Sequence, residues 1–133
     1  MPRRLNPCHK EHTHELYRRI RHCSAQGEQT EFIEHAERGD SVFIEYGANR
    51  VLECWDDDVK EGKLTDFRRA VQAKADEAVV FSWIEWPNKT TRDAAMAKVM
   101  NDPRLNPQGN PMPFDGKRTI FGGFAGRLCA QHG

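Results

Sequence analysis

The chain has 133 residues, with 20 Lys and Arg, 20 Asp and Glu, and a formal net charge of zero at pH 7. This length predicts one domain with its own core, and the charge balance argues against a general basic surface for nucleic acid. No apolar run approaches the roughly 18 residues that span a bilayer, and no apolar segment follows Arg3 and Arg4 as in a signal peptide. Four cysteines are too few for a disulfide framework. We therefore expect a cytoplasmic protein with no membrane partner.

Residues 1–29 differ in composition from the rest of the chain. They contain four of the six histidines and two of the four cysteines, with almost no periodic apolar pattern. Zinc commonly binds side chains of the types found at Cys8, His9, His12 and His14, but their spacing fits no standard zinc module. We expect a disordered or mistranslated leader over 1–29 and no metal or other cofactor, with a zinc site as the alternative.

Regular structure is predicted from Thr30 onward. Apolar residues recur at helical spacing across Glu31–Tyr46, and Gly47 follows where a helix commonly ends. The next segment, Asn49–Trp55, alternates between two faces as a strand does. It is followed by three aspartates, Asp56, Asp57 and Asp58. We favour a solvated loop there over a calcium or magnesium site, because the spacing of an EF-hand is missing.

The segment Thr65–Val71 is predicted to form a short strand or a single helical turn. Its charged residues are Asp66, Arg68 and Arg69. Such groups usually form ion pairs at the surface that contribute little to stability. The alternative is that Arg69 binds an anion.

The longest run of high β-propensity and low charge is Val79–Trp86. On a strand, one face would carry Val79, Phe81 and Trp83, and the other Val80, Ile84 and Trp86. Because both faces are apolar, we predict a strand in the middle of a sheet, buried on both sides.

A second helix and a last strand complete the predicted domain. Asn88 is a good N-cap for a helix that continues to Met100. After a proline-rich loop, Lys117–Phe124 is predicted as a strand. The adjacent Gly122 and Gly123 indicate either a bulge or a place where another backbone or a ligand comes close.

Several motifs over residues 30–125 together carry a family resemblance. They are Arg50–Trp55 (RVLECW), Gly62–Val71 (GKLTDFRRAV), Val79–Pro87 (VVFSWIEWP), Arg92-Asp93, Asp102–Arg104 (DPR), Met112–Arg118 (MPFDGKR) and Gly122–Phe124 (GGF). In this combination the chain resembles the YbaA-like group, small bacterial proteins of unknown function. The resemblance implies an α+β, ferredoxin-like βαββαβ domain of the dimeric α/β-barrel superfamily, in which two sheets pack face to face in a homodimer. It carries over no catalytic residue, and residues 126–133 are expected to be a tail.

The front of the chain departs from this family. Members open with a strand close to Met-Ser-Tyr-Ile-Asp-Gly-Phe-Val-Ile-Ala-Val-Pro, whereas this chain has Leu16–Ala25 (LYRRIRHCSA) at that place. Codons can be written for His14–Ala25 that encode the family strand when they are read one base later. We hypothesise that residues 1–29 are an out-of-frame translation, so that the first strand is missing or corrupted. Val79–Trp86 would then have an open apolar edge, which predicts poor solubility.

No motif in the sequence identifies a reaction. Without a Cys–His or Ser–His pairing, nucleophilic catalysis has no support, and an enzyme of this resemblance would be a cofactor-free monooxygenase. We expect a small homodimer that binds a small molecule in a pocket between sheet and helices. The candidate pocket residues are Trp55, Arg69, Trp83, Arg92 and Asp115. The alternative for each is a structural role: core filling for the tryptophans, ion pairing for the arginines, and a turn cap for Asp115.

Two other functions stay open. One is a homodimeric interaction or stress-related module without chemistry. The other is RNA binding through bases stacked on exposed aromatic residues of the sheet, since some members of the group carry a signal-recognition-particle RNA label. The net charge of zero, and a sheet face expected to be used for dimerisation, make nucleic acid the least favoured partner. His35, on a helix face crowded with acidic residues, is expected in solvent.

Overall fold

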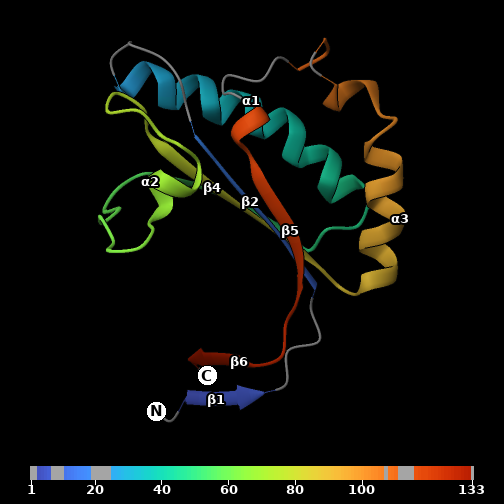
Figure 1. Cartoon of the computed structure of the whole chain (residues 1–133). Coiled ribbons are helices and arrows are strands. Elements are labelled where there is room, and N and C mark those ends of the chain that lie inside the picture. Colours follow the sequence, from blue (N-terminus) through green and yellow to red (C-terminus); the bar gives the residue numbers. More distant parts are fainter. Residues whose placement is uncertain (1–2, 7–10, 19–24, 107, 111–115, 133) are drawn as a thin grey trace.

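An antiparallel sheet of four strands organises the structure. The computed structural model describes residues 3–6, 11–18, 25–106, 108–110 and 116–132. In spatial order the strands are β3 (Arg50–Trp55), β4 (Val79–Trp86), β2 (Glu11–Arg18) and β5 (Ile120–Ala125). A separate antiparallel pair, β1 (Arg3–Asn6) with β6 (Cys129–His132), brings the two ends of the described chain side by side (Figure 1).

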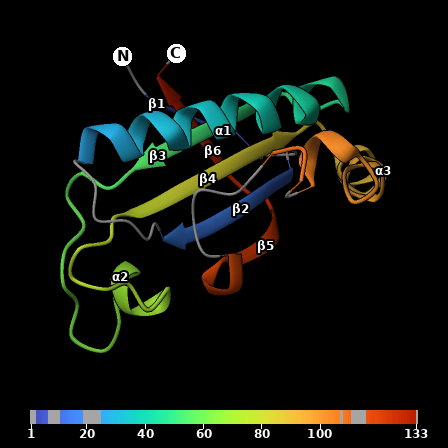
Figure 2. The ribbon, with the colours of Figure 1, turned by 90° about the horizontal axis from the view of Figure 1, so that it is seen from above.

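The helices lie on both sides of this sheet. Helices α1 (Ala25–Glu45) and α3 (Lys89–Val99) lie on one side, and the short α2 (Phe67–Ala70) lies on the other (Figure 1). Figure 2 shows α1 beside β3 and α3 beyond the end of β4. Two 3-10 turns, η1 (Pro103–Leu105) and η2 (Gly116–Arg118), complete the fold. Among the described residues, no helix has both the length and the apolar character needed to cross a lipid bilayer.

Strand β4 is an interior strand, as its sequence predicts. It pairs with β3 on one side and with β2 on the other. The face toward α1 is fully buried, with Val80, Ile84 and Trp86 at most 2% exposed. On the opposite face Val79 is buried, whereas Phe81 and Trp83 are only half-buried. Burial on both sides is therefore confirmed for one face and only partly for the other.

The structure corrects the prediction that the first strand is missing. Strand β2 lies between β4 and β5, where it pairs Glu11 with Trp86 and Arg18 with Val79. The expected open edge on β4 is therefore wrong, and the prediction of poor solubility loses that basis. The sequence misled because Glu11–Arg18 (EHTHELYR) contains only two apolar residues, Leu16 and Tyr17, and an interior strand usually contains more. Helix α1 also begins at Ala25, earlier than the predicted Glu31.

The core fills the space between the sheet and the two long helices. Trp86 is fully buried, and the Phe43 ring meets it edge-on with centroids 6.4 Å apart and planes at 79°. A second cluster joins Phe32 of α1 to Val80 and Trp55, with the Phe32 and Trp55 ring centroids 5.7 Å apart. Offset and edge-on aromatic pairs of this kind contribute about 0.5–1.5 kcal/mol beyond the area they bury.

Local capping follows the sequence closely. The Asn88 side chain accepts a hydrogen bond of 2.8 Å from the Thr91 N–H, which confirms it as the N-cap of α3. Strand β5 pairs with β2 residue for residue through Gly122 and Gly123, so the predicted bulge is wrong. The group that comes close at this point is a side chain, and not the backbone or ligand predicted as the alternative: a Cβ at Gly123 would lie 2.8 Å from Nη1 of Arg92.

Candidate ligand-binding cleft

A cleft of about 320 Å³ opens between the sheet and α2. Helix α2 lies on the side of the sheet away from α1 (Figure 1). Its size falls within the usual range of small-molecule sites, roughly 300–1,000 Å³. The lining is mainly apolar at the base and acidic at the mouth: Cys54, Trp55, Val59, Phe67, Val79 and Phe81, with Asp56, Asp57 and Asp58.

The pairing of β3 with β4 builds the base of the cleft. Cys54 lies opposite Phe81 in this ladder, so both side chains project from the same face of the sheet. The ladder ends at Asp56, whose N–H donates to the Val79 carbonyl at 2.9 Å while its carboxylate accepts from the Val79 N–H at 3.2 Å. This closing pair fixes the place at which the acidic segment leaves the sheet.

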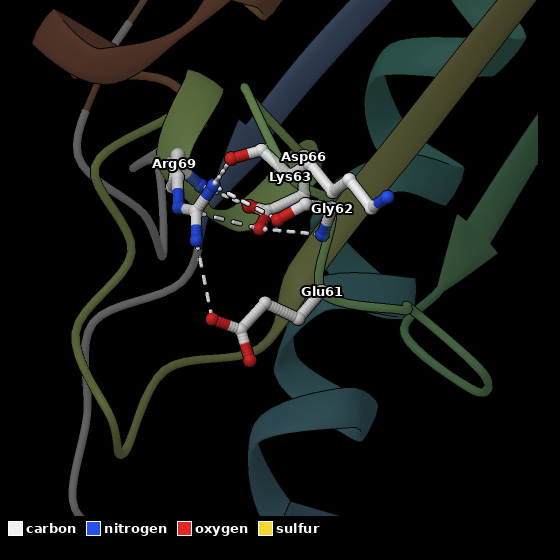
Figure 3. Close-up of polar contacts among 5 residues, drawn as sticks. All are labelled: Glu61, Gly62, Lys63, Asp66 and Arg69. Carbon is white, nitrogen blue, oxygen red and sulfur yellow. Dashed lines mark hydrogen bonds and ion pairs between the residues drawn. The ribbon is translucent and has the colours of Figure 1, made fainter.

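A polar loop holds the opposite wall in place (Figure 3). The Arg69 guanidinium donates to the carbonyls of Gly62 and Lys63 at 3.0 and 3.1 Å, and pairs with the Glu61 carboxylate at 3.1 Å. Asp66 caps α2 by accepting hydrogen bonds from the N–H groups of Arg69 and Gly62, which lower the pKa of its carboxyl. These contacts fix the start of α2, and with it Phe67, which lines the cleft.

The three aspartates at the mouth differ in their partners. Asp56 lies 3.5 Å from Arg68, which also donates to the Glu77 carbonyl. Asp58 pairs with Lys60 at 2.8 Å, and both side chains are well exposed. Asp57 is exposed and forms no hydrogen bond or ion pair with any residue that the structure describes. The mouth therefore retains negative charge, centred on Asp57.

The structure does not bring the five predicted pocket residues together. Among the four that are described, Trp55 alone borders the cleft, and its ring packs on the other face of the sheet, against Phe32 and Val80. Arg69 holds the neighbouring loop, and Trp83 lies on the same face of β4 as Phe81 but further along the strand. Arg92 lies on α3, on the other side of the sheet, where it pairs with Asp93 at 3.3 Å. Asp115 lies outside the described residues.

Sequence reasoning missed Cys54, Phe67 and Phe81 as cleft residues. The alternation within Asn49–Trp55 and Val79–Trp86 does place Cys54 and Phe81 on defined faces. Their meeting depends on the register between β3 and β4, which no local pattern specifies. Phe67 comes from a helical turn whose position depends on the loop around Arg69.

A group of polar side chains lies under α1, on the other side of the sheet. The Ser82 hydroxyl donates to the Glu53 carboxylate at 3.0 Å, and Glu53 also forms a hydrogen bond with Asp40 of α1. Burial raises the pKa of Asp40 to about 6, and the bond to Glu53 offsets part of this rise. Asp40 therefore keeps its proton in mildly acidic solution.

Two further polar groups attach loops to α1. Tyr46 donates to the Asp102 carboxylate at 2.5 Å, and Arg104 pairs with Asp102 at 2.8 Å. Hydrogen bonds from Arg104 and Tyr46 hold the pKa of Asp102 well below its usual range, while the bond to Asp102 raises the pKa of Tyr46. His35 is half-buried rather than in solvent, because its Nδ1 lies 3.0 Å from the Oδ1 of the buried Asn110. The expectation for His35 is therefore wrong.

Comparison with known proteins connects this fold to a family. Residues 24–116 match the family described as "Protein of unknown function (DUF1428)". The chain belongs to the DUF1428 family. It is 57% identical over 93 residues to the uncharacterized protein YbaA of Escherichia coli strain K12, and equally similar to YbaA of Escherichia coli O157:H7 and of Shigella flexneri. The match covers 70% of this chain and 80% of each relative, and confirms the resemblance expected from the motifs.

The cleft lies within the DUF1428 part of the chain. All of its lining residues fall between Cys54 and Phe81, inside the matched span. The first 23 residues, which include β1 and β2, precede that span. The hypothesis that this front segment is translated out of frame stays a prediction, and the codons of His14–Ala25 decide it.

Proposed function

We propose that this DUF1428 protein is a cytoplasmic homodimer that binds a small, largely apolar molecule in the cleft between the sheet and α2. The observation that carries the proposal is the cleft itself, whose base combines Cys54, Val79 and Phe81 of the sheet with Phe67 of α2. Apolar concave sites with a few polar groups at one end are typical of small-molecule binding. The proposal includes no catalytic step.

The arrangement of the sheet supports the dimer. The strand order β3-β4-β2-β5, with α1 and α3 on one side, is compatible with a ferredoxin-like βαββαβ unit. The face away from these helices, called the open face, carries the apolar residues Leu52, Cys54, Phe81, Trp83, Ile120 and Phe124. Leu52, Ile120 and Phe124 are 46–57% exposed. We propose that a second sheet packs over Leu52, Ile120 and Phe124, beside the cleft, as in a dimeric α/β barrel, because exposed apolar patches of this kind often mark interfaces.

The walls of the cleft favour a ligand with an aromatic or aliphatic body. Phe67 is 53% exposed in the structure, and the neighbouring Phe81 is half-buried. A ligand that covers these rings removes apolar surface from water at about 25 cal/mol per Å². The free thiol of Cys54 is a small and weakly polar group, so it fits the same preference.

Amide chemical shifts test the proposal on the full chain. Titration with 2-phenylethanol, a small neutral probe, should shift the amides of residues 54–59, Phe67 and 79–81. Phe67→Ala should weaken binding about fivefold, the cost expected for one aromatic wall. The control is Phe121→Ala, which removes a 76% exposed ring outside the cleft and should leave binding unchanged. Absence of shifts at millimolar probe, or shifts confined to another surface, would refute the proposal.

A further inference from the structure

The charge at the mouth of the cleft restricts the ligand further. Among the described lining residues, three are aspartates and none is Lys, Arg or His. The cations that contact these aspartates are already engaged: Arg68 with Asp56 and the Glu77 carbonyl, and Lys60 with Asp58. An anionic ligand would therefore meet repulsion from like charges, while a cation would be attracted.

Asp57 is the carboxylate best placed to meet such a cation. Asp56 is committed to the end of the sheet through the Val79 N–H and to Arg68. Asp58 already pairs with Lys60, and water screens this exposed pair, so that Asp58 offers a ligand little further attraction. Asp57 has no ionic partner in the described part of the chain, so binding a cation there breaks no existing pair.

We infer that the natural ligand of the cleft is a small amine, with an apolar body against Phe67, Val79 and Phe81 and a protonated nitrogen at Asp57. This inference rests on the proposed function and adds the chemical class of the ligand. The size of the cleft, about 320 Å³, lies at the lower end of small-molecule sites and favours a compact molecule over a folded partner. The apolar base accepts the body, and the acidic mouth sets the orientation.

Three probes that share a phenylethyl body and differ in charge separate this inference from the proposal on which it rests. These are 2-phenylethylamine, 2-phenylethanol and 3-phenylpropanoate, which at pH 7 are cationic, neutral and anionic. Each is titrated into the full chain and followed by amide chemical shifts. We expect the amine to bind about fivefold more tightly than the alcohol, as one ion pair at an exposed mouth allows, and the carboxylate to bind most weakly. The advantage of the amine should decrease between low and high salt.

A charge-removing variant then tests Asp57 itself. Asp57→Asn should reduce the affinity for the amine to that for the alcohol and leave the alcohol unaffected. The matched control, Glu34→Gln, removes one exposed negative charge on α1 and should change neither affinity. Equal binding of amine and alcohol would overturn the inference but leave the proposed function standing. Failure of all three probes would overturn both, and an amine preference that survives Asp57→Asn would overturn the role of Asp57.

Discussion

Arg118 and Glu77 form an ion pair at 3.2 Å in which the two side chains are only 10% and 1% exposed. Arg118 precedes β5 and Glu77 precedes β4, so the pair ties together two segments that enter the sheet from the same end. Arg118 also donates to the Gln72 carbonyl at 3.2 Å, and Glu77 accepts from the Lys74 N–H at 2.8 Å. At this end of the sheet, the buried charge of Glu77 is therefore balanced by the Arg118 guanidinium and by a backbone hydrogen bond.

Removing the cation should be costly for stability. Arg118→Met keeps most of the apolar stem but removes the guanidinium that neutralises the buried Glu77 carboxylate. We expect a loss of about 3–5 kcal/mol in the free energy of unfolding, measured with urea. Lys60→Met is the control, because it breaks an exposed pair with Asp58 and should cost less than about 1 kcal/mol. Equal losses of stability for the two variants would show that the Arg118–Glu77 pair contributes no more than an exposed ion pair.

Asp40 should make stability depend on pH in mildly acidic solution. Its folded pKa of about 6 lies above the ordinary value of 3.8, so between these values the native state binds more protons than the unfolded state. Its contribution is therefore fully present below pH 3.8 and is lost as the pH rises to about 6. Asp40→Asn removes this titration and should raise stability at pH 7 by about 1 kcal/mol, after allowance for partial exposure.

The Asp40 prediction is checked by urea unfolding at several pH values. The difference between the variant and the unchanged chain should grow from pH 4 to pH 6 and then stay constant. Glu34→Gln, on the exposed surface of the same helix, should show no such growth. If the stability of Asp40→Asn and that of the unchanged chain depended on pH in the same way, Asp40 would not be the group responsible.

Gly123 should tolerate a side chain less well than Gly122. A Cβ at Gly123 would lie 2.8 Å from Nη1 of Arg92, whereas one at Gly122 would meet Phe124 at an ordinary 3.5 Å. Gly123→Ala must displace the Arg92 guanidinium and should lower the free energy of unfolding by about 1 kcal/mol. Gly122→Ala should change it by no more than about 0.5 kcal/mol. The double variant Gly123→Ala with Arg92→Ala should lose less stability, measured by thermal or urea unfolding, than the sum of the losses of the two single variants. Strict additivity would show that the two residues do not interfere.

The open face should control the oligomeric state. Leu52→Asp introduces a charge into the proposed dimer interface, where it would be buried without a partner. We expect the chain to sediment as a dimer and the variant as a monomer in analytical ultracentrifugation. Leu64→Asp is the control, since Leu64 is 97% exposed and lies outside the open face. A dimer that survives Leu52→Asp would place the interface elsewhere.

Sequence patterns predicted those elements whose structure depends mainly on residues close together in the sequence. The alternation in Val79–Trp86 identified an interior strand, and Asn88 identified the start of α3. Strand β2 was missed because its place in the sheet is set by pairing with β4 and β5 and not by its own composition. The same reason explains the cleft: Cys54 and Phe81 come together only through the strand register, and Phe67 joins them only through a loop held by Arg69.

The polar composition of β2 also fits the hypothesis that residues 1–29 are translated out of frame. The gene's codons for His14–Ala25 must yield the family strand when read one base later, or the hypothesis fails. A chain carrying that strand should melt at a higher temperature, because an interior strand gains more from apolar residues.

The most direct measurement is a crystal structure of the full chain with bound 2-phenylethylamine. We expect the ring of the probe to lie between Phe67 and Phe81, with its nitrogen within hydrogen-bond distance of Asp57. An empty cleft at saturating probe, or a probe bound on another surface, would contradict it.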